Sequence, residues 1–130
     1  MIEKIQMIEV GLLRHIEDYS RKRVKWLKEK ILSEGIWTVP VKIDSKHHLV
    51  MDGQHRMEVA LSLKLKYVPC FLYDYDDVEV WSLRKNYNVT QKIIIDRALA
   101  DNIYPYKTAK HRFPWGNDEL CSIPIEELRN

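Results

Sequence analysis

The sequence lacks three features that would assign it to a class at once: a strong excess of charge of one sign, a long apolar run and paired cysteines. Its formal net charge is only +2, and binding nucleic acid through phosphate neutralisation needs a concentrated basic face. No run approaches the ~20 apolar residues of a membrane span. The cysteines Cys70 and Cys121 have no CxxC spacing, which argues against a zinc site or redox pair. We expect a buried Cys70 and a partly exposed Cys121.

The remaining composition is that of an ordinary globule, with 45% apolar and 31% charged residues. The start, Met1 to Lys4, does not combine a basic segment, an apolar run and a small-residue cleavage site, so we expect a cytoplasmic protein without a membrane partner. A length of 130 residues gives room for one core. We predict a single α+β domain over residues 1–130, with a short mixed sheet and helices packed around it.

Hydrophobic periodicity predicts the elements of this domain. Apolar residues at helical spacing indicate helices over 20–34, from just after Gly53, and from a Thr90 cap to about Leu99. Pro69 favours an edge strand or a bulge at that position. Residues 106–130 are predicted to be rich in loops, with only 125–128 helical. The predicted strands cover 5–10, 67–73 and 78–83, together with a hairpin of 39–43 and 48–51 around the polar turn 44–46.

The segment Asp52-Gly53-Gln54-His55-Arg56 is the first candidate site. It places a glycine where a strand turns sharply into a helix, and the unpaired N–H groups of a helix start attract anions. Arg56, one turn into the helix, adds a permanent positive charge suited to phosphate oxygens. Asp52 would repel a bare phosphate, so its position makes sense if it holds a divalent cation that bridges phosphate oxygens. The alternative is structural: Asp52 caps the helix while His55 and Arg56 lie on the surface, and spacing alone favours this second interpretation.

A second candidate is the basic loop between Tyr104 and Pro114. It contains several cationic side chains and one hydroxyl within a few positions, which indicates an anion ligand, although such clusters are often only solvated turns. The side chains concerned are Lys107, Thr108, Lys110, His111 and Arg112.

Glu17 is the third candidate. It lies between the first predicted strand and the first predicted helix. A carboxylate near a substrate hydroxyl can accept its proton as the oxygen attacks phosphorus. The alternative is an acidic residue that interacts favourably with a helix N-terminus.

The sequence resembles the free L-serine kinases of the ParB/sulfiredoxin-like superfamily, whose motif is a D-G-x-H-R turn. The resemblance rests on three segments in the same order: Glu17, VMDGQHR and YKTAKHRFP. The resemblance extends from the first strand to Pro114. It implies Mg²⁺-dependent transfer of the terminal phosphate of ATP or ADP to the hydroxyl of free serine, which yields O-phosphoserine. It implies Glu17 as the catalytic base and Asp52 as the residue near the metal and the reacting phosphate. It also implies phosphate binding by Gly53, Gln54, His55, Arg56, Lys107, Thr108, Lys110 and His111, and substrate binding by Arg84 and His111.

The chain departs from the family pattern at several of these positions. Gln54 replaces a common histidine, and Leu83 stands where a tryptophan is frequent. Ala109 replaces a threonine and Lys110 an arginine, which changes the grip on a phosphate or carboxylate because lysine lacks the bidentate fork. Sulfiredoxins carry their working cysteine at the position that Gln54 occupies here, and this substitution argues against sulfiredoxin activity.

Two hypotheses follow. The first is an enzyme that binds a nucleotide and a small hydroxy amino acid, with nucleic acid an unfavoured partner and the oligomeric state open. The second is a non-catalytic ParB-like nucleotide-binding regulator or DNA-associated module. Glu17 discriminates them, since only a kinase needs a base there, and the kinase hypothesis requires Glu17 to face the glycine turn across a cleft.

Overall fold

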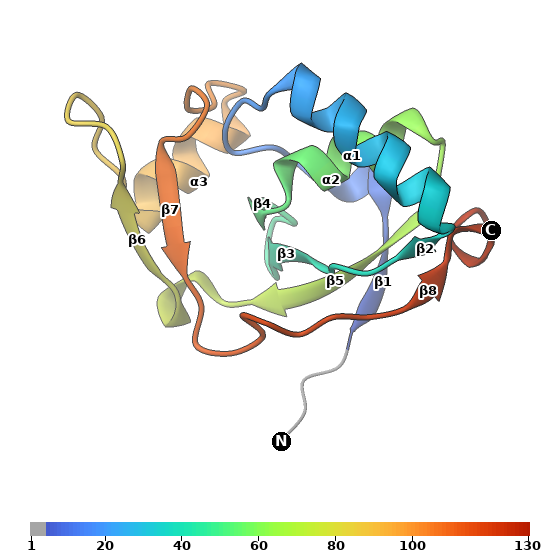
Figure 1. Cartoon of the computed structure of the whole chain (residues 1–130). Helices are drawn as coiled ribbons and strands as arrows, with labels where there is room; N and C mark the ends of the chain where they lie inside the picture. The colour runs from blue at the N-terminus through green and yellow to red at the C-terminus, as the bar shows by residue number, and fades with distance from the viewer. Residues whose placement is uncertain (1–4) are drawn as a thin grey trace.

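The computed structural model describes residues 5–130 and is built on a four-stranded mixed sheet. Its strands are β1 (Gln6–Glu9), β3 (Val41–Asp44), β4 (Val50–Asp52) and β5 (Tyr67–Tyr73). They lie in the order β1-β5-β3-β4, visible in Figure 1. β3 and β5 are parallel, whereas β1 with β5 and β3 with β4 are antiparallel. The predicted α+β class and the hairpin of β3 and β4 are therefore confirmed.

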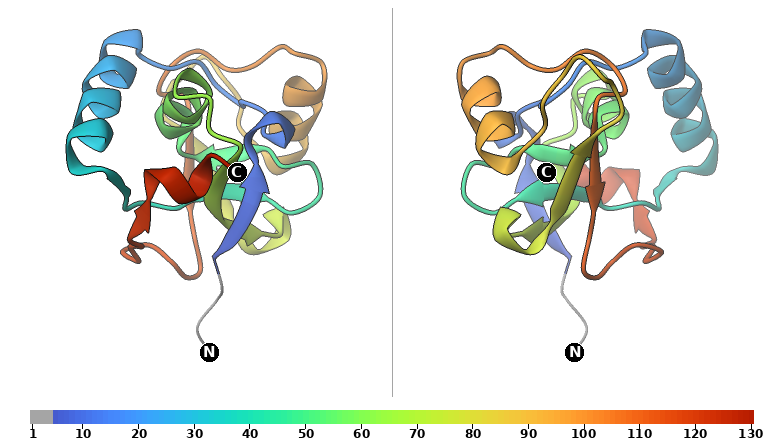
Figure 2. Two further views of the ribbon diagram at one scale, coloured as in Figure 1. Left: turned by 90° about the vertical axis from the view of Figure 1, so that its right-hand side faces the viewer. Right: turned by 90° about the vertical axis from the view of Figure 1, so that its left-hand side faces the viewer.

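In the described part of the chain, three α-helices pack around the sheet: α1 (Arg21–Glu34), α2 (Gln54–Ser62) and α3 (Gln91–Leu99). The Ser20 hydroxyl caps α1 by accepting the Arg23 N–H at 3.2 Å, and Thr90 caps α3 in the same way. Gly35 ends α1 in the left-handed region, with φ 72°. α1 packs against α2 over one side of the sheet, and α3 lies apart from this pair, as both views of Figure 2 show.

Two small antiparallel sheets extend the fold. β2 (Ile36–Trp37) pairs with β8 (Ile123–Pro124), and β6 (Glu79–Ser82) pairs with β7 (Ala109–Arg112). Short 3-10 helices cover Val10–Leu12, Tyr75–Asp77 and Ile125–Leu128. The strand predicted over 78–83 is confirmed as β6, and the helical turn at 125–128 is confirmed as a 3-10 helix.

Two hydrophobic clusters fix the end of β4, where the candidate site begins. One contains Leu27 and Ile31 of α1 together with Val50 of β4. The other contains Met51 of β4 and Ile94 of α3. Because successive residues of a strand point to opposite faces, Val50 and Met51 bury their side chains in different clusters and hold the strand from both sides.

One sequence prediction is wrong and a second is incomplete. β5 is not an edge strand, since β1 and β3 flank it; Pro69 lies opposite Met7, and pairing with β3 begins one residue later at Cys70, so the missing N–H does not interrupt that ladder. The tail 106–130 is rich in loops, as predicted, but it also contains the strands β7 and β8, which were not predicted. β7 has the sequence Ala-Lys-His-Arg, which shows no apolar alternation, and it forms by pairing with a distant strand.

The expected cysteine environments are confirmed, with Cys70 buried, Cys121 partly exposed, and both thiols free. Within residues 5–130, no helix combines the length and the apolar character needed to cross a membrane.

Candidate active site

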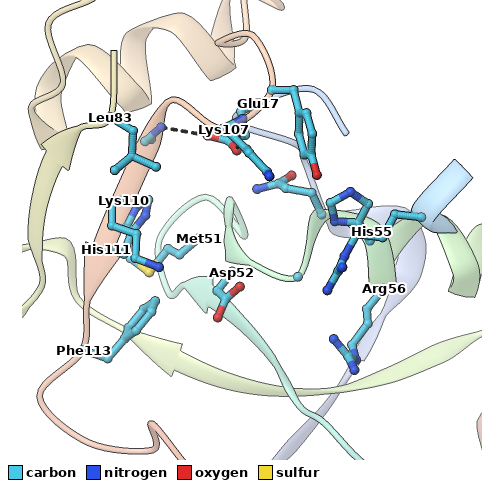
Figure 3. A pocket seen from close by; sticks show the side chains of 15 residues that line it. Glu17, Met51, Asp52, His55, Arg56, Leu83, Lys107, Lys110, His111 and Phe113 are labelled. Carbon is cyan, nitrogen blue, oxygen red and sulfur yellow. Dashed lines mark hydrogen bonds between the residues drawn. The ribbon is translucent and has the colours of Figure 1, made fainter. Parts of the chain in front are cut away.

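A cavity of about 440 Å³ brings together segments that are far apart in the sequence. Its size falls in the range of about 300–1,000 Å³ common for small-molecule sites. Figure 3 shows Glu17 and Lys107 on one side of the cavity, and His55 and Arg56 on another. The predicted site residues that line it are Glu17, Asp52, Gly53, Gln54, His55, Arg56, Lys107, Lys110 and His111.

The turn between β4 and α2 has the geometry expected of a phosphate-binding turn. β4 ends at Asp52, and Gly53 leaves it with φ 124°, a conformation that side-chain-bearing residues rarely adopt. A Cβ at Gly53 would lie 3.0 Å from Cγ1 of Val41, so β3 also leaves no room for one. α2 then starts at Gln54, and its first N–H groups have no partners within the helix.

Glu17 faces this turn across the cavity, and backbone N–H groups hold its carboxylate. Oε1 accepts the N–H of Ala109 at 2.8 Å and that of Thr108 at 3.3 Å, and Oε2 accepts the N–H of Lys107 at 3.2 Å. Lys107 has φ 56°, and such left-handed residues form concave groups of N–H donors that bind anions. Burial raises the pKa of Glu17, although these N–H groups and the charge of Arg84 oppose the shift. A raised pKa makes a carboxylate a better proton acceptor.

Both histidines of the cavity favour the neutral form. Burial, together with the charges of Arg23 and Arg56, lowers the pKa of His55, whose Nε2 accepts the N–H of Ser20 at 3.0 Å. Burial also lowers the pKa of His111 to about 4, and its Nε2 lies 3.0 Å from the hydroxyl of Tyr75. Neutral imidazoles can offer a phosphate one N–H donor each but no net charge.

Three residues that were predicted to bind phosphate or substrate have side chains that are hydrogen-bonded to other parts of the protein. The Gln54 amide is occupied by protein partners, because Nε2 donates to the carbonyl of Val50 at 2.5 Å and Oε1 contacts His15 at 2.6 Å. Thr108 is fully buried and its hydroxyl donates to Pro105. Arg84 lies outside the lining, with its guanidinium donating to the carbonyl of Tyr106 at 2.8 Å.

Sequence reasoning missed Arg23, which enters the cavity from the first turn of α1. A usable signal was present, because the Ser20 cap fixes the start of the helix and places residue 23 in its first turn. The other lining residues that were not assigned to the site are Met51, Leu83, Tyr106, Ala109 and Phe113.

The cavity carries a local excess of positive charge. Four cationic side chains line it, against the two carboxylates of Glu17 and Asp52. Magnesium in nucleotide sites commonly takes one or two carboxylates together with phosphate oxygens, and the exposed side chain of Asp52 fits that pattern. Within residues 5–130, no three His, Cys, Asp or Glu residues cluster as a metal site formed by the protein alone. The cations are Arg23, Arg56, Lys107 and Lys110.

The sequence is similar to known proteins over part of its length. No protein-family model matches the sequence. An ATP-dependent L-serine kinase from Staphylothermus marinus is 36% identical over 78 residues, and one from Desulfurococcus mucosus is 30% identical over 78 residues. Each match covers 57% of this chain but only 31% of the relative. The chain therefore spans about a third of the length of these curated relatives.

The likeness in structure is more extensive than the likeness in sequence. A free serine kinase in complex with AMP superimposes with a TM-score of 0.87 at 14% identity, covering 97% of this chain and 94% of that chain. SbnI with C-terminal truncation from Staphylococcus aureus superimposes with a TM-score of 0.80 at 11% identity, covering 97% and 89%. The resemblance noted from the motifs is thus confirmed: the chain has the fold of the free serine kinases and shares sequence with ATP-dependent L-serine kinases over part of its length.

Proposed function

We propose that this chain is a small-molecule kinase that transfers the terminal phosphate of a nucleotide to the hydroxyl of free L-serine or a similar small hydroxy amino acid. The donor is ATP, which the names of the curated relatives specify, or ADP. The sequence similarity to those kinases, the fold and the chemistry of the cavity support this proposal. In this proposal the whole chain, residues 1–130, acts as one catalytic domain.

The observation that carries the proposal is that Glu17 and the Gly53–Arg56 turn line one cavity. The serine hydroxyl would give its proton to Glu17 as its oxygen bonds to the terminal phosphorus, and the bond from that phosphorus to the nucleotide would break. Within residues 5–130, Oε2 of Glu17 accepts one N–H bond, which is long at 3.2 Å, and so it keeps a lone pair for this proton. The products are O-phosphoserine and the nucleotide shortened by one phosphate.

The remaining side chains would bind the two substrates. The first N–H groups of α2 and the guanidinium of Arg56 would hold the phosphates, with Lys107 and Lys110 near the transferring group. Asp52 would hold the magnesium ion, whose positive charge would offset the negative charge of the phosphates. His111 would bind the phosphate or the amino acid through its neutral ring. Arg84 would act on the amino acid at longer range or after its bond to Tyr106 is broken, and Thr108 would act through its backbone.

The test is a phosphorus NMR assay of the purified chain with magnesium, serine and either ATP or ADP. We expect a phosphoserine signal in the wild type. Glu17→Gln should lose turnover by at least about 100-fold, because general-base catalysis contributes on this scale. The nucleotide Kd of this variant, measured by calorimetry, should stay close to that of the wild type.

The matched control is Asp18→Asn, which changes the neighbouring carboxylate. Asp18 lies outside the cavity lining and accepts the N–H of Tyr19, a bond that the asparagine oxygen can retain. This variant should keep its turnover. If the chain binds a nucleotide but forms no phosphoserine with either ATP or ADP, the result would contradict the kinase function and favour the non-catalytic regulator.

A further inference from the structure

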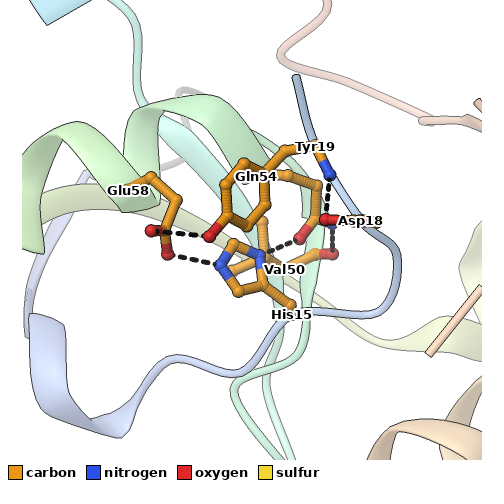
Figure 4. Close-up of polar contacts among 6 residues, drawn as sticks. All are labelled: His15, Asp18, Tyr19, Val50, Gln54 and Glu58. Atoms are coloured by element: carbon orange, nitrogen blue, oxygen red, sulfur yellow. Dashed lines mark hydrogen bonds and ion pairs between the residues drawn. The ribbon is translucent and has the colours of Figure 1, made fainter. Parts of the chain in front are cut away.

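The loop that carries Glu17 is attached to α2 by a small polar network, drawn in Figure 4. The two ring nitrogens of His15 contact two side chains of α2: Nδ1 lies 2.6 Å from Oε1 of Gln54, and Nε2 lies 2.7 Å from Oε2 of Glu58. Tyr19 adds a third contact, since its hydroxyl donates to Oε1 of Glu58 at 2.9 Å. His15 and Glu58 expose only 16% and 23% of their side chains, so water competes weakly for these bonds.

The direction of these bonds follows from the donors and acceptors available. Nε2 of Gln54 donates to the carbonyl of Val50, which leaves Oε1 of Gln54 as an acceptor. Nδ1 of His15 must therefore donate to Gln54. Glu58 accepts the Tyr19 hydroxyl on one oxygen and contacts the imidazole with the other. Each of these polar groups thus has a partner, so the loss of one member leaves others unsatisfied.

The network joins the two halves of the proposed active site. Gln54 is the first residue of α2, directly after Gly53, and His15 and Tyr19 lie two residues before and after Glu17. The N–H of Ser20 continues the connection by donating to His55 at 3.0 Å. Glu17 is therefore held in a loop that is attached to α2 on both of its sides.

We propose that His15 is a positioning residue that acts through Gln54 and Glu58 to fix Glu17 relative to the phosphate-binding turn. This role rests on the proposed kinase function. Removing the imidazole would free both the Glu17 loop and the side chain that opens α2. A displacement of about 1 Å at a catalytic group can cost on the order of 100-fold in rate, even when the substrate still binds.

The kinetic test compares His15→Phe with Glu58→Gln. His15→Phe keeps a ring but removes both polar contacts, and we expect kcat to fall by about 10–100-fold while KM for the nucleotide changes much less. Glu58→Gln should retain most activity, because the glutamine side chain has the same shape and its amide keeps a hydrogen-bonding atom opposite Nε2 of His15 and another opposite the Tyr19 hydroxyl. Glu29→Gln, on the exposed face of α1, is the matched control. An unchanged kcat in His15→Phe, or an equal loss in Glu58→Gln, would overturn the proposal.

A second readout does not depend on catalysis. The amides of Lys107, Thr108 and Ala109 donate to Glu17, so their hydrogen exchange reports whether Glu17 stays in place. In His15→Phe these amides should exchange at least about 10-fold faster, whereas the Ile94 amide of α3 should not change. An inactive wild type that shows this effect would contradict the kinase but keep the positioning role. Unchanged exchange at these amides in His15→Phe, or an equal acceleration in His15→Phe and Glu58→Gln, would contradict the positioning role.

Discussion

At the scale of single residues, His111 links the site to the stability of the fold. Burial lowers its pKa from the ordinary value of 6.5 to about 4. Between these two pH values the unfolded chain binds a proton that the folded chain does not, so stability falls as the pH drops from about 6.5 to about 4. We expect His111→Gln to flatten this part of the stability curve, with a difference on the order of 1–3 kcal/mol in the free energy of unfolding. Urea denaturation at a series of pH values measures it.

Tyr75→Phe is the control for this pH effect. It removes only the hydroxyl that lies 3.0 Å from Nε2 of His111 and leaves the ring buried. Because burial is the main cause of the lowered His111 pKa and the charge of Lys110 is the second, the loss of stability between pH 6.5 and about 4 should persist in this variant. The same pH dependence in His111→Gln and the wild type would show that His111 is not its source.

Arg23 is a residue whose place in the cavity lining only the folded structure reveals. It lines the cavity near His55, and a guanidinium there can bind a phosphate group. Arg23→Ala should weaken ADP binding by about 3–30-fold, the range of one charge-assisted hydrogen bond with partial exposure. Lys22→Ala removes a neighbouring positive charge outside the cavity and should have little effect. Equal losses of affinity in the two variants, by calorimetry, would point to general electrostatics instead.

At the scale of elements, the connection between β4 and α2 depends on Gly53. Gly53→Ala must adopt φ near 124° and place a Cβ 3.0 Å from Val41, so we expect a loss of about 2–4 kcal/mol in the free energy of unfolding. Gly35→Ala is the matched comparison, because its φ of 72° is also positive but a Cβ there meets nothing within 4 Å. Strain alone should cost that variant about 1–2 kcal/mol. If thermal or urea unfolding gives the same loss of free energy of unfolding for Gly53→Ala and Gly35→Ala, then Val41 moves aside without cost.

The same elements show what the sequence could predict. α1 and α3 carry helical periodicity with Ser20 and Thr90 as caps, and the change of period after Gly53 located α2, because these signals are local. β7 was missed because its stability comes from pairing with β6, about thirty residues earlier. The inner position of β5 was missed for a related reason, since the neighbours of a strand are set by the whole topology.

The candidate site could also be predicted only in part from the sequence. The motif and the resemblance identified the residues from Asp52 to Arg56 and from Lys107 to His111 as a group, and most of them line one cavity. The orientation of individual side chains could not be predicted. Gln54 turns to His15 and Thr108 to Pro105, because buried polar atoms must find partners that are distant in the sequence or hidden within a loop.

At the scale of the whole molecule, a nearly balanced chain concentrates positive charge in one place. The formal net charge is +2, yet four cations and two carboxylates line the cavity. Raising the salt from about 0.05 to about 0.5 M shortens the Debye length from about 14 to about 4 Å, which screens such a local field. We therefore expect the Kd for ADP to rise by about 3–10-fold over this range. Adenosine, which has the same base and sugar but no phosphate, should change by less than about 2-fold. If both ligands respond alike, the phosphates do not lie among these cations, and the anion-binding role of the cavity would have to be abandoned.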